Sequence, residues 1–313
     1  MKYPIGIQSF EQIIEDDYVY LDKTALVYDL VTKGKIYFLS RPRRFGKSLL
    51  VSTLKCYFEG KKELFKGLAI DKQEKEWKQY PVFHLDFNGN NFTNPGVLEQ
   101  TLMSFVERQE AIYGKDEYSV TLGDRFVSVL KEAHRKTGLR AVVLIDEYDK
   151  PLLDVLDTNI KTTIDGQERL LEDWHREILK GFYSVFKAAD AYLQFVLLTG
   201  VTKFSQVSVF SGFNQPNDIS MDEHYEALCG ITEEELEGAT VTIFGDPLTH
   251  STAGLVSPGD QSDGEIKPYY DAATKKYEAL VPPQDMTGKP LIRISIGSND
   301  FTYLSLIHIS EPT

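Results

Sequence analysis

The chain has 313 residues, of which 42% are hydrophobic and 26% are charged, so it can bury one large core or two modest ones. Disorder throughout the chain is therefore excluded. With 34 basic and 47 acidic residues, the formal net charge of -13 argues against a broad basic face that holds a nucleic-acid backbone. Cys56 and Cys229 form no CxxC pair, which excludes a disulfide framework and suits a reducing compartment.

The first twenty residues are acidic and lack the basic start and apolar run of a secretory signal. No uncharged apolar stretch reaches the length of about 18 residues that a membrane-spanning helix needs. We therefore expect a cytoplasmic protein without a membrane segment.

Hydrophobic periodicity predicts a helix over residues 23–32, a strand over 35–40 and a second helix from Ser48 to Gly60. Further strands are predicted over 81–87, 141–147 and 192–200, and further helices over Asn94–Tyr113 and Glu168–Ala189. Strands that alternate with long helices are typical of a parallel sheet covered by helices. The last two strands are almost continuously apolar, which places them at the buried centre of the sheet.

The composition changes after residue 238. Seven of the thirteen prolines lie in the 75 residues from Ala239 onward, among glycine-rich turns and short alternating apolar runs. This pattern predicts a β-rich segment, either a β-sandwich or a fragment of one.

A Gly-Lys-Ser motif stands between the strand over 35–40 and the helix that follows it. Inward-pointing backbone N–H groups bind phosphate, which Gly46 permits, and the positive end of a helix dipole adds to this attraction. Lys47 would supply a cation and Ser48 a ligand for Mg²⁺. In the pattern GxxxxGK(S/T) the first glycine is replaced by Arg41. The Gly-Lys-Ser motif alone is equally consistent with an ordinary strand-to-helix turn. The candidate phosphate-binding residues are Arg44, Phe45, Gly46, Lys47, Ser48 and Leu49.

An acid pair ends the strand VVLIDE, the arrangement of a Walker B motif. Asp146 would hold Mg²⁺, and Glu147 would act as general base on the attacking water. Taken alone, the pair is also consistent with two acids that simply end a strand in solvent. Asp149 and Lys150 follow directly, and they either assist the site or cap the helix that Pro151 opens.

The strand over 192–200 delivers Thr199 to the same sheet edge, where it could sense the γ-phosphate or position water. Lys203 follows in the chain and either neutralises charge on the phosphate or is a solvated loop cation. Next to the phosphate-binding motif, Arg41, Arg43 and Arg44 form a basic cluster that suits phosphates, an acidic partner or the acid pair.

Residues 3 to 237 resemble the AAA-ATPase-like family of bacterial P-loop proteins, which are often joined to a PD-(D/E)xK nuclease-like domain. The family carries RPRRFGKS at this place, with Arg41 where the common pattern has glycine. The resemblance rests on the segments PIGIQSFEQI, YVYLDKTALVYDLV, YFLSRPRRFGKSLLVSTL, YFEGKKELFKGLAI, VVLIDEYDKPLL, LLTGVTKFSQVSVFSGFNQPNDIS and ALCGITEEEL.

This resemblance implies a P-loop fold of the additional-strand type, in which the strand that ends at Thr199 separates the phosphate-loop strand from the Walker B strand. It implies that ATP and Mg²⁺ are bound, with Gly46, Lys47 and Ser48 on phosphate and metal. Asp146 and Glu147 would serve Mg²⁺ and water, and Thr199 with Lys203 would act as sensors. The family also implies assembly into homo-oligomers and a nuclease-like effector.

The C-terminal side departs from the family. Residues 1–237 would form the ATPase-like domain without its lid, and no D…ExK pattern follows residue 238. Residues 238–303 resemble a fragment of the fimbrillin-like adhesins, and 304–313 resemble a translated sequencing adapter. We therefore expect a chimeric chain whose β-rich part is an incomplete domain.

The leading functional hypothesis is an ATP-binding P-loop domain with Mg²⁺-dependent hydrolysis that drives or gates an attached effector. The first alternative is a nucleotide-gated switch or scaffold that does not hydrolyse ATP, because the loop lacks its first glycine. The second alternative is an adhesin-like structural protein, which requires the β-rich segment to be authentic. Neither a membrane nor a strong nucleic-acid surface is expected.

Overall fold

The computed structural model describes Pro4, residues 6–202 and 216–232, and the strands between Ala239 and Tyr303. The chain divides into two compact units. One comprises Ile7–Gly230, and the other joins Met1–Gly6 with Ile231–Thr313.

The larger unit is built on a parallel sheet with the strand order β2-β3-β6-β1-β7. Its strands are β1 (Ile36–Ser40), β2 (Val82–Asp86), β3 (Ala141–Asp146), β6 (Leu193–Gly200) and β7 (Asn217–Asp218). The predicted α/β fold is confirmed. β6 lies between β1 and β3, which is the arrangement of the additional-strand P-loop class.

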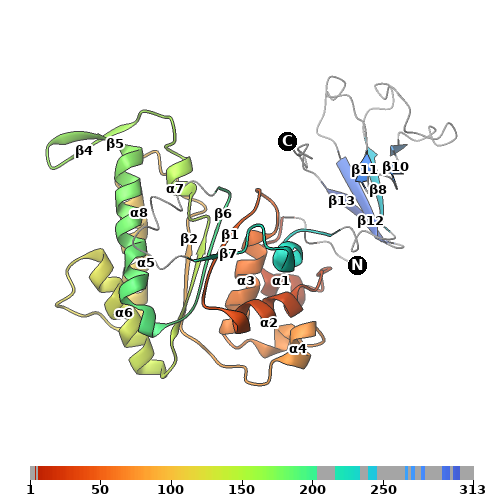
Figure 1. The fold of residues 1–313 in the computed structure, drawn as a ribbon, viewed down its shortest axis with the longest axis horizontal. Helices are drawn as coiled ribbons and strands as arrows, with labels where there is room; N and C mark the ends of the chain where they lie inside the picture. Colours follow the sequence, from red (N-terminus) through yellow and green to blue (C-terminus); the bar gives the residue numbers. More distant parts are fainter. Residues whose placement is uncertain are drawn as a thin grey trace. The chain divides into compact units, whose positions relative to one another are not determined.

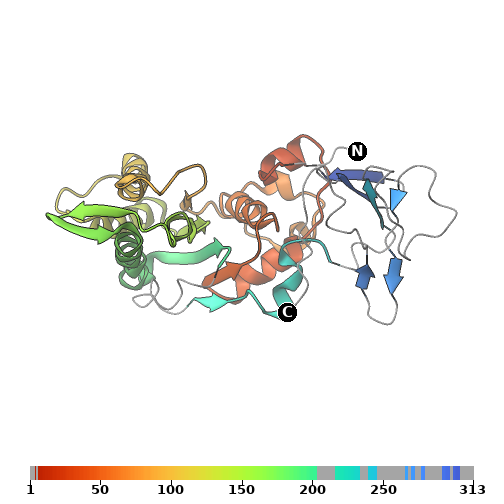
Figure 2. The same ribbon diagram turned by 90° about the horizontal axis from the view of Figure 1, so that it is seen from above.

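Both faces of the sheet are covered by helices, because side chains alternate between the faces along each strand. On β3, Val142 and Leu144 join one core cluster, whereas Val143 and Ile145 join the other. One face carries α1 (Phe10–Glu15), α2 (Thr24–Lys33), α3 (Lys47–Phe58) and α4 (Ala69–Gln73). The other carries α5 (Val97–Tyr113), α6 (Leu122–Thr137) and α8 (Leu171–Ala188), as Figures 1 and 2 show.

Two predicted helices begin three residues later than expected, α5 at Val97 instead of Asn94 and α8 at Leu171 instead of Glu168. The helix expected from Glu168 begins at Leu171, because the preceding residues form a hairpin of β4 (Lys161–Ile164) and β5 (Gln167–Leu170). Asp165 and Gly166 make its turn with φ values of 50° and 79°, the conformation that Asp-Gly favours in two-residue hairpin loops. The hairpin projects beyond the end of α8 in Figure 1.

Short helical segments complete the larger unit. They are α7 (Lys150–Leu153) and three short 3₁₀ segments, η1 (Lys62–Phe65), η2 (Asp190–Tyr192) and η3 (Glu223–Leu228). No helix in the described residues combines the length and the apolar character that crossing a bilayer requires. Cys56 and Cys229 are free, buried thiols.

The smaller unit is β-rich, as expected. An antiparallel sheet has the order β13-β12-β8-β9, formed by β13 (Asn299–Tyr303), β12 (Leu291–Ile296), β8 (Ala239–Phe244) and β9 (Glu265–Ile266). A separate antiparallel pair consists of β10 (Tyr269–Asp271) and β11 (Lys276–Glu278). Residues 304–313, which resemble an adapter, lie outside the described residues.

Replacing two glycines of the larger unit by alanine should change the free energy of unfolding in opposite directions. At Gly200, in β6, a Cβ atom would lie 2.6 Å from Tyr148 Cδ1 and 2.8 Å from Asp149 Oδ1. At Gly181, inside α8, nothing lies within 4 Å of the added atom. We expect Gly200→Ala to lower the free energy of unfolding by about 1–3 kcal/mol through overpacking. Gly181→Ala should raise it by about 0.5–1 kcal/mol, because alanine favours helix.

Urea unfolding of both variants beside the wild type measures these effects. A Gly200→Ala variant as stable as the wild type would contradict the close packing of β6 against Tyr148.

Candidate functional site

The carboxyl ends of the parallel strands bring the predicted polar residues to one edge of the sheet. In the register of β1 and β6, Ser40 pairs with Gly200, and in that of β2 and β3, Asp86 pairs with Asp146. Thr199 Oγ1 donates a short hydrogen bond to Asp146 Oδ1. Residues from segments that are far apart in the sequence therefore meet at one place, as expected for this sheet type.

The loop between β1 and α3, residues 41–46, is the phosphate loop; it is anchored at its start and strained farther along. Arg41 N–H donates to Gly200 O at 3.1 Å, and the Arg41 guanidinium donates to Ser220 O. Arg44 and Gly46 then adopt positive φ values of 66° and 84°. A positive φ costs little at Gly46 but is unfavourable at Arg44, so the surrounding contacts determine the loop conformation.

Arg41 therefore has a structural role. It occupies the position where the common pattern has glycine, and its side chain ties the loop to the turn after β7.

Lys47 points into the loop. Only 5% of this residue is exposed, and its Nζ donates to Arg41 O at 2.9 Å and to Pro42 O at 3.0 Å. Burial lowers the pKa of Lys47, whereas the charges of Asp146 and Glu147 oppose that shift. The ammonium group is thus held near both acids, at the start of α3.

The first turn of α3 is arranged around Gly46, the N-cap residue, which offers no side-chain hydrogen bond to the helix. Ser48 is half-buried in this turn, and Leu49 packs against the core beneath it. Phe45 is 43% exposed, and its ring lies against Gly230, where a Cβ atom would come within 3.2 Å of it. The first backbone N–H groups of a helix attract an anion, which suits a phosphate ligand here.

Asp86, Asp146 and Glu147 stand at this edge, and the pKa of Asp86 and that of Glu147 are raised. Burial raises the pKa of Glu147, and the charge of Asp146 adds to the effect. Burial likewise raises the pKa of Asp86, and Asp146 again contributes. Asp146 itself is 2% exposed and also accepts from Glu147 N–H at 3.1 Å. A bound cation would relieve this repulsion.

Asp86 was absent from the sequence-based candidates. The signal was present, because an acid at the end of a half-buried strand arrives at the same edge as Asp146.

The donor set fits Mg²⁺ held jointly with a nucleotide. In the described part of the chain, no three His, Cys, Asp or Glu side chains converge as a ready-made metal site. Mg²⁺ is usually bound by one or two protein oxygens together with phosphates and water. The Ser48 hydroxyl and the Asp146 carboxylate are oxygen donors of the kind that such a site uses.

Asp149 has a role that neither sequence-based alternative describes. It stands at the N-cap position of α7 without a side-chain cap bond. Its buried Oδ2 instead accepts from Val201 N at 2.9 Å, Thr202 N at 2.7 Å and Thr202 Oγ1 at 2.8 Å. Tyr148 OH donates to Thr202 O at 2.8 Å. Tyr148 and Asp149 thereby clamp the residues after β6 to the end of β3.

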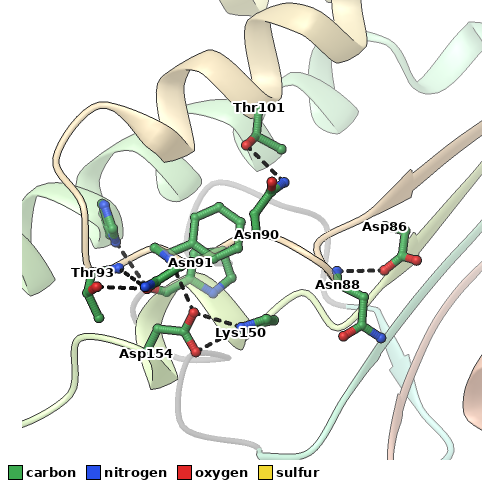
Figure 3. Close-up of polar contacts among 11 residues, drawn as sticks. Asp86, Asn88, Asn90, Asn91, Thr93, Thr101, Lys150 and Asp154 are labelled. Atoms are coloured by element: carbon green, nitrogen blue, oxygen red, sulfur yellow. Dashed lines mark hydrogen bonds and ion pairs between the residues drawn. The ribbon is translucent and has the colours of Figure 1, made fainter.

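Lys150 does not reach toward the phosphate loop. Its Nζ donates to both carboxylate oxygens of Asp154, at 2.9 and 2.7 Å, and lies 5.7 Å from the Phe92 ring centre. Asp154 Oδ2 also accepts from Phe92 N–H at 3.3 Å, while Asn90 donates to Thr101 at 3.3 Å. Figure 3 shows the bonds between Lys150 and Asp154 and between Asn90 and Thr101. Through Asp154, Lys150 helps to order the loop after β2.

The structure brings together the predicted residues Lys47, Asp146, Glu147 and Thr199. Arg44 is exposed on the loop. Lys203 lies outside the described residues, so its predicted sensor role stays a prediction.

The strand order and this polar edge define an α/β protein of the P-loop class. The model of the family described as predicted AAA-ATPase matches residues 4–210. The chain therefore belongs to that family, which confirms the resemblance and indicates nucleotide binding.

Among curated proteins, the Azotobacter chroococcum mcd 1 protein named "Uncharacterized protein in vnfD 5'region" is 38% identical over 286 residues. The match covers 91% of this chain and 51% of that protein, so this chain spans about half of its relative's length. No solved structure matches the chain significantly.

The Asp149 clamp predicts a graded loss of stability. Asp149→Ala leaves the buried N–H groups of Val201 and Thr202 without an acceptor, so it should cost about 2–3 kcal/mol of unfolding free energy. Asp149→Asn keeps one acceptor oxygen and should cost less. Chemical denaturation measures both, and Glu117→Ala, at an exposed position with ordinary backbone geometry, serves as control. Equal losses for Ala and Asn would contradict the clamp.

Proposed function

We propose that residues 7–230 bind ATP at the edge formed by the phosphate loop, β3 and β6, and hydrolyse it with Mg²⁺. The observation that carries the proposal is the convergence of Lys47, Asp146, Glu147 and Thr199 beside the N-terminus of α3. Family membership supports a nucleotide ligand, and the family description, predicted AAA-ATPase, favours ATP.

Each residue has a chemical role in this proposal. The first N–H groups of α3 and the Lys47 ammonium would bind the β- and γ-phosphates. Ser48 and Asp146 would hold Mg²⁺, which neutralises charge on the phosphates. Glu147 would accept a proton from the attacking water, helped by a pKa that is already raised. Thr199 orients the Asp146 carboxylate through its hydrogen bond.

A non-hydrolysing switch is the second candidate, and the position of Lys47 favours it. Its Nζ is bound by the carbonyl groups of Arg41 and Pro42. Phosphate must replace these contacts, so nucleotide binding would rearrange the loop even without hydrolysis. The nucleotide would then act on an attached effector, which we propose to be the nuclease-like kind that the family resemblance implies.

Lys47→Ala should weaken ATP binding by about tenfold or more, because it removes the cation on the phosphates. Fluorescence titration with a labelled ATP analogue measures the loss. Lys55→Ala is the matched control, since Lys55 lies on the same helix at a distance from the loop. Unchanged affinity of Lys47→Ala would exclude the phosphate-loop site.

Glu147→Gln separates the enzyme from the switch. If Glu147 is the general base, the variant should lose about 10²–10⁴-fold in kcat while ATP binding is kept. Phosphate release and nucleotide titration are measured on the same preparation, with Glu117→Gln as an exposed control. Wild-type binding without turnover would favour the switch, and turnover unchanged in Glu147→Gln would remove Glu147 as the base.

A further inference from the structure

A groove of about 610 Å³ lies between α5, α6 and α8, apart from the phosphate loop. Apolar side chains dominate its wall, namely Met103, Leu122, Val127, Trp174, Ile178 and Val185. Val185 is buried in the core cluster, and Leu122, Val127 and Ile178 are half-buried and pack against it. The groove therefore has an apolar floor that is continuous with the core.

One of the two glycines that line this groove leaves it open. Gly181 lies in the middle of α8 with open space above it, whereas a Cβ atom at Gly123 would come within 3.1 Å of Val185. Glycine inside a helix costs about 0.5–1 kcal/mol relative to alanine. At Gly181 the small residue leaves room for the close approach of another backbone.

The charge of the groove is one-sided. Its ionisable lining residues are Glu99, Asp124 and Glu177, and no lysine, arginine or histidine lines it. Arg169 neutralises one end, since it pairs with Glu177 at 2.5 Å and lies over the Trp174 ring. Glu99 and Asp124 form no ion pair within the described part of the chain, so the rest of the rim remains negative.

Glu99 has an unused hydrogen-bonding position. Its Oε1 accepts from Trp174 Nε1 at 2.5 Å, whereas its buried Oε2 has no hydrogen-bond partner among the described residues. A buried carboxylate oxygen without a donor is unfavourable. A cationic group that enters the groove would remove this cost.

Two large exposed side chains, Tyr118 and Val120, lie next to the groove, just before the start of α6. Tyr118 is 94% exposed and Val120 is 84% exposed, in the loop that leads to the groove residue Thr121. Asp116 holds this loop in place by accepting from Tyr118 N at 3.0 Å and from Ser119 Oγ at 2.9 Å. Large side chains presented on an ordered backbone bind with a small entropy cost and are typical of interfaces.

A second copy of this chain is a poor occupant, because Asp116 and Glu117 flank the exposed Tyr118 and would meet an equally acidic rim. The net charge of -13 adds to this repulsion. A basic partner instead gains attraction at the same positions. On α8 the lining residues extend from Trp174 to Ala188, which is about 21 Å at roughly 1.5 Å per residue, or about four helical turns.

We propose that this groove docks a basic amphipathic helix of a partner protein. Its apolar stripe would lie against Leu122 and Ile178, its backbone would approach Gly181, and a lysine or arginine would pair with Glu99. This interaction is independent of the proposed nucleotide chemistry.

The test uses a fluorescein-labelled model peptide of about 16 residues, with leucines on one helical face and lysines on the other. We expect the full chain to bind it with micromolar affinity in fluorescence anisotropy. Gly181→Phe, which fills the groove, and Glu99→Gln should each weaken binding by about tenfold. Two matched controls, Gln100→Phe on exposed α5 surface and Glu63→Gln in η1, should bind within about twofold of the wild type.

Several results would overturn the proposal. The first is that the wild type does not bind the peptide. The second is that Gly181→Phe and Glu99→Gln both bind it as tightly as the wild type does. The third is that the wild type binds a scrambled peptide of the same composition as tightly as the amphipathic one. Circular dichroism establishes that Gly181→Phe is folded, and Glu99→Gln tests the groove if it is not. Sedimentation velocity that shows a wild-type dimer lost in Gly181→Phe would assign the groove to self-association instead.

Discussion

The larger unit depends on the insertion of β6 between β1 and β3. Each of its two parallel ladders joins strands that are far apart in the sequence, so neither can form without long loop closures. Once they form, the ends of β1, β3 and β6 lie side by side. The phosphate loop, the acid pair and Thr199 then share one edge, and no local interaction would have placed them there.

That edge is stiffened by polar contacts with the residues that follow each strand. Asp149 and Tyr148 clamp the residues after β6, and Arg41 bonds to Gly200 and to Ser220. Gly200 has no side chain because Tyr148 occupies the space. The phosphate loop is thereby held at both of its flanking strands, while Lys47 remains on carbonyl groups that a ligand can replace. A fixed frame around one exchangeable cation suits repeated nucleotide binding.

The strands β1, β2, β3 and β6 could be predicted from sequence because each is a short apolar run with clear ends, whereas β7 consists of two exposed polar residues and was missed. Lys47, Asp146 and Glu147 were also predictable, since their motifs stand directly after such strands. The roles of Asp149 and Arg41 were not, because their partners Val201 and Ser220 are distant in the chain and carry no signal. The hairpin before α8 was missed although Asp-Gly marks its turn, since its strands are polar and exposed.

The groove on α5, α6 and α8 and the phosphate edge are linked through the chain, because α8 leads through η2 into β6. The proposed docking groove and the proposed nucleotide site thus share one connected element. Any coupling between them would have to pass along α8 and β6, and it requires two arrangements of these elements.

Hydrogen–deuterium exchange on the full chain, with and without Mg²⁺ and ATP, tests the central claim most directly. The account predicts that ATP slows exchange in the phosphate loop and the first turn of α3, residues 41–50, and at 146–149. Exchange in the last turn of α6, residues 134–137, which precedes the opposite, amino end of β3, should stay unchanged. No slowing at 41–50 under saturating ATP, or slowing confined to other segments, would contradict a nucleotide site at this edge.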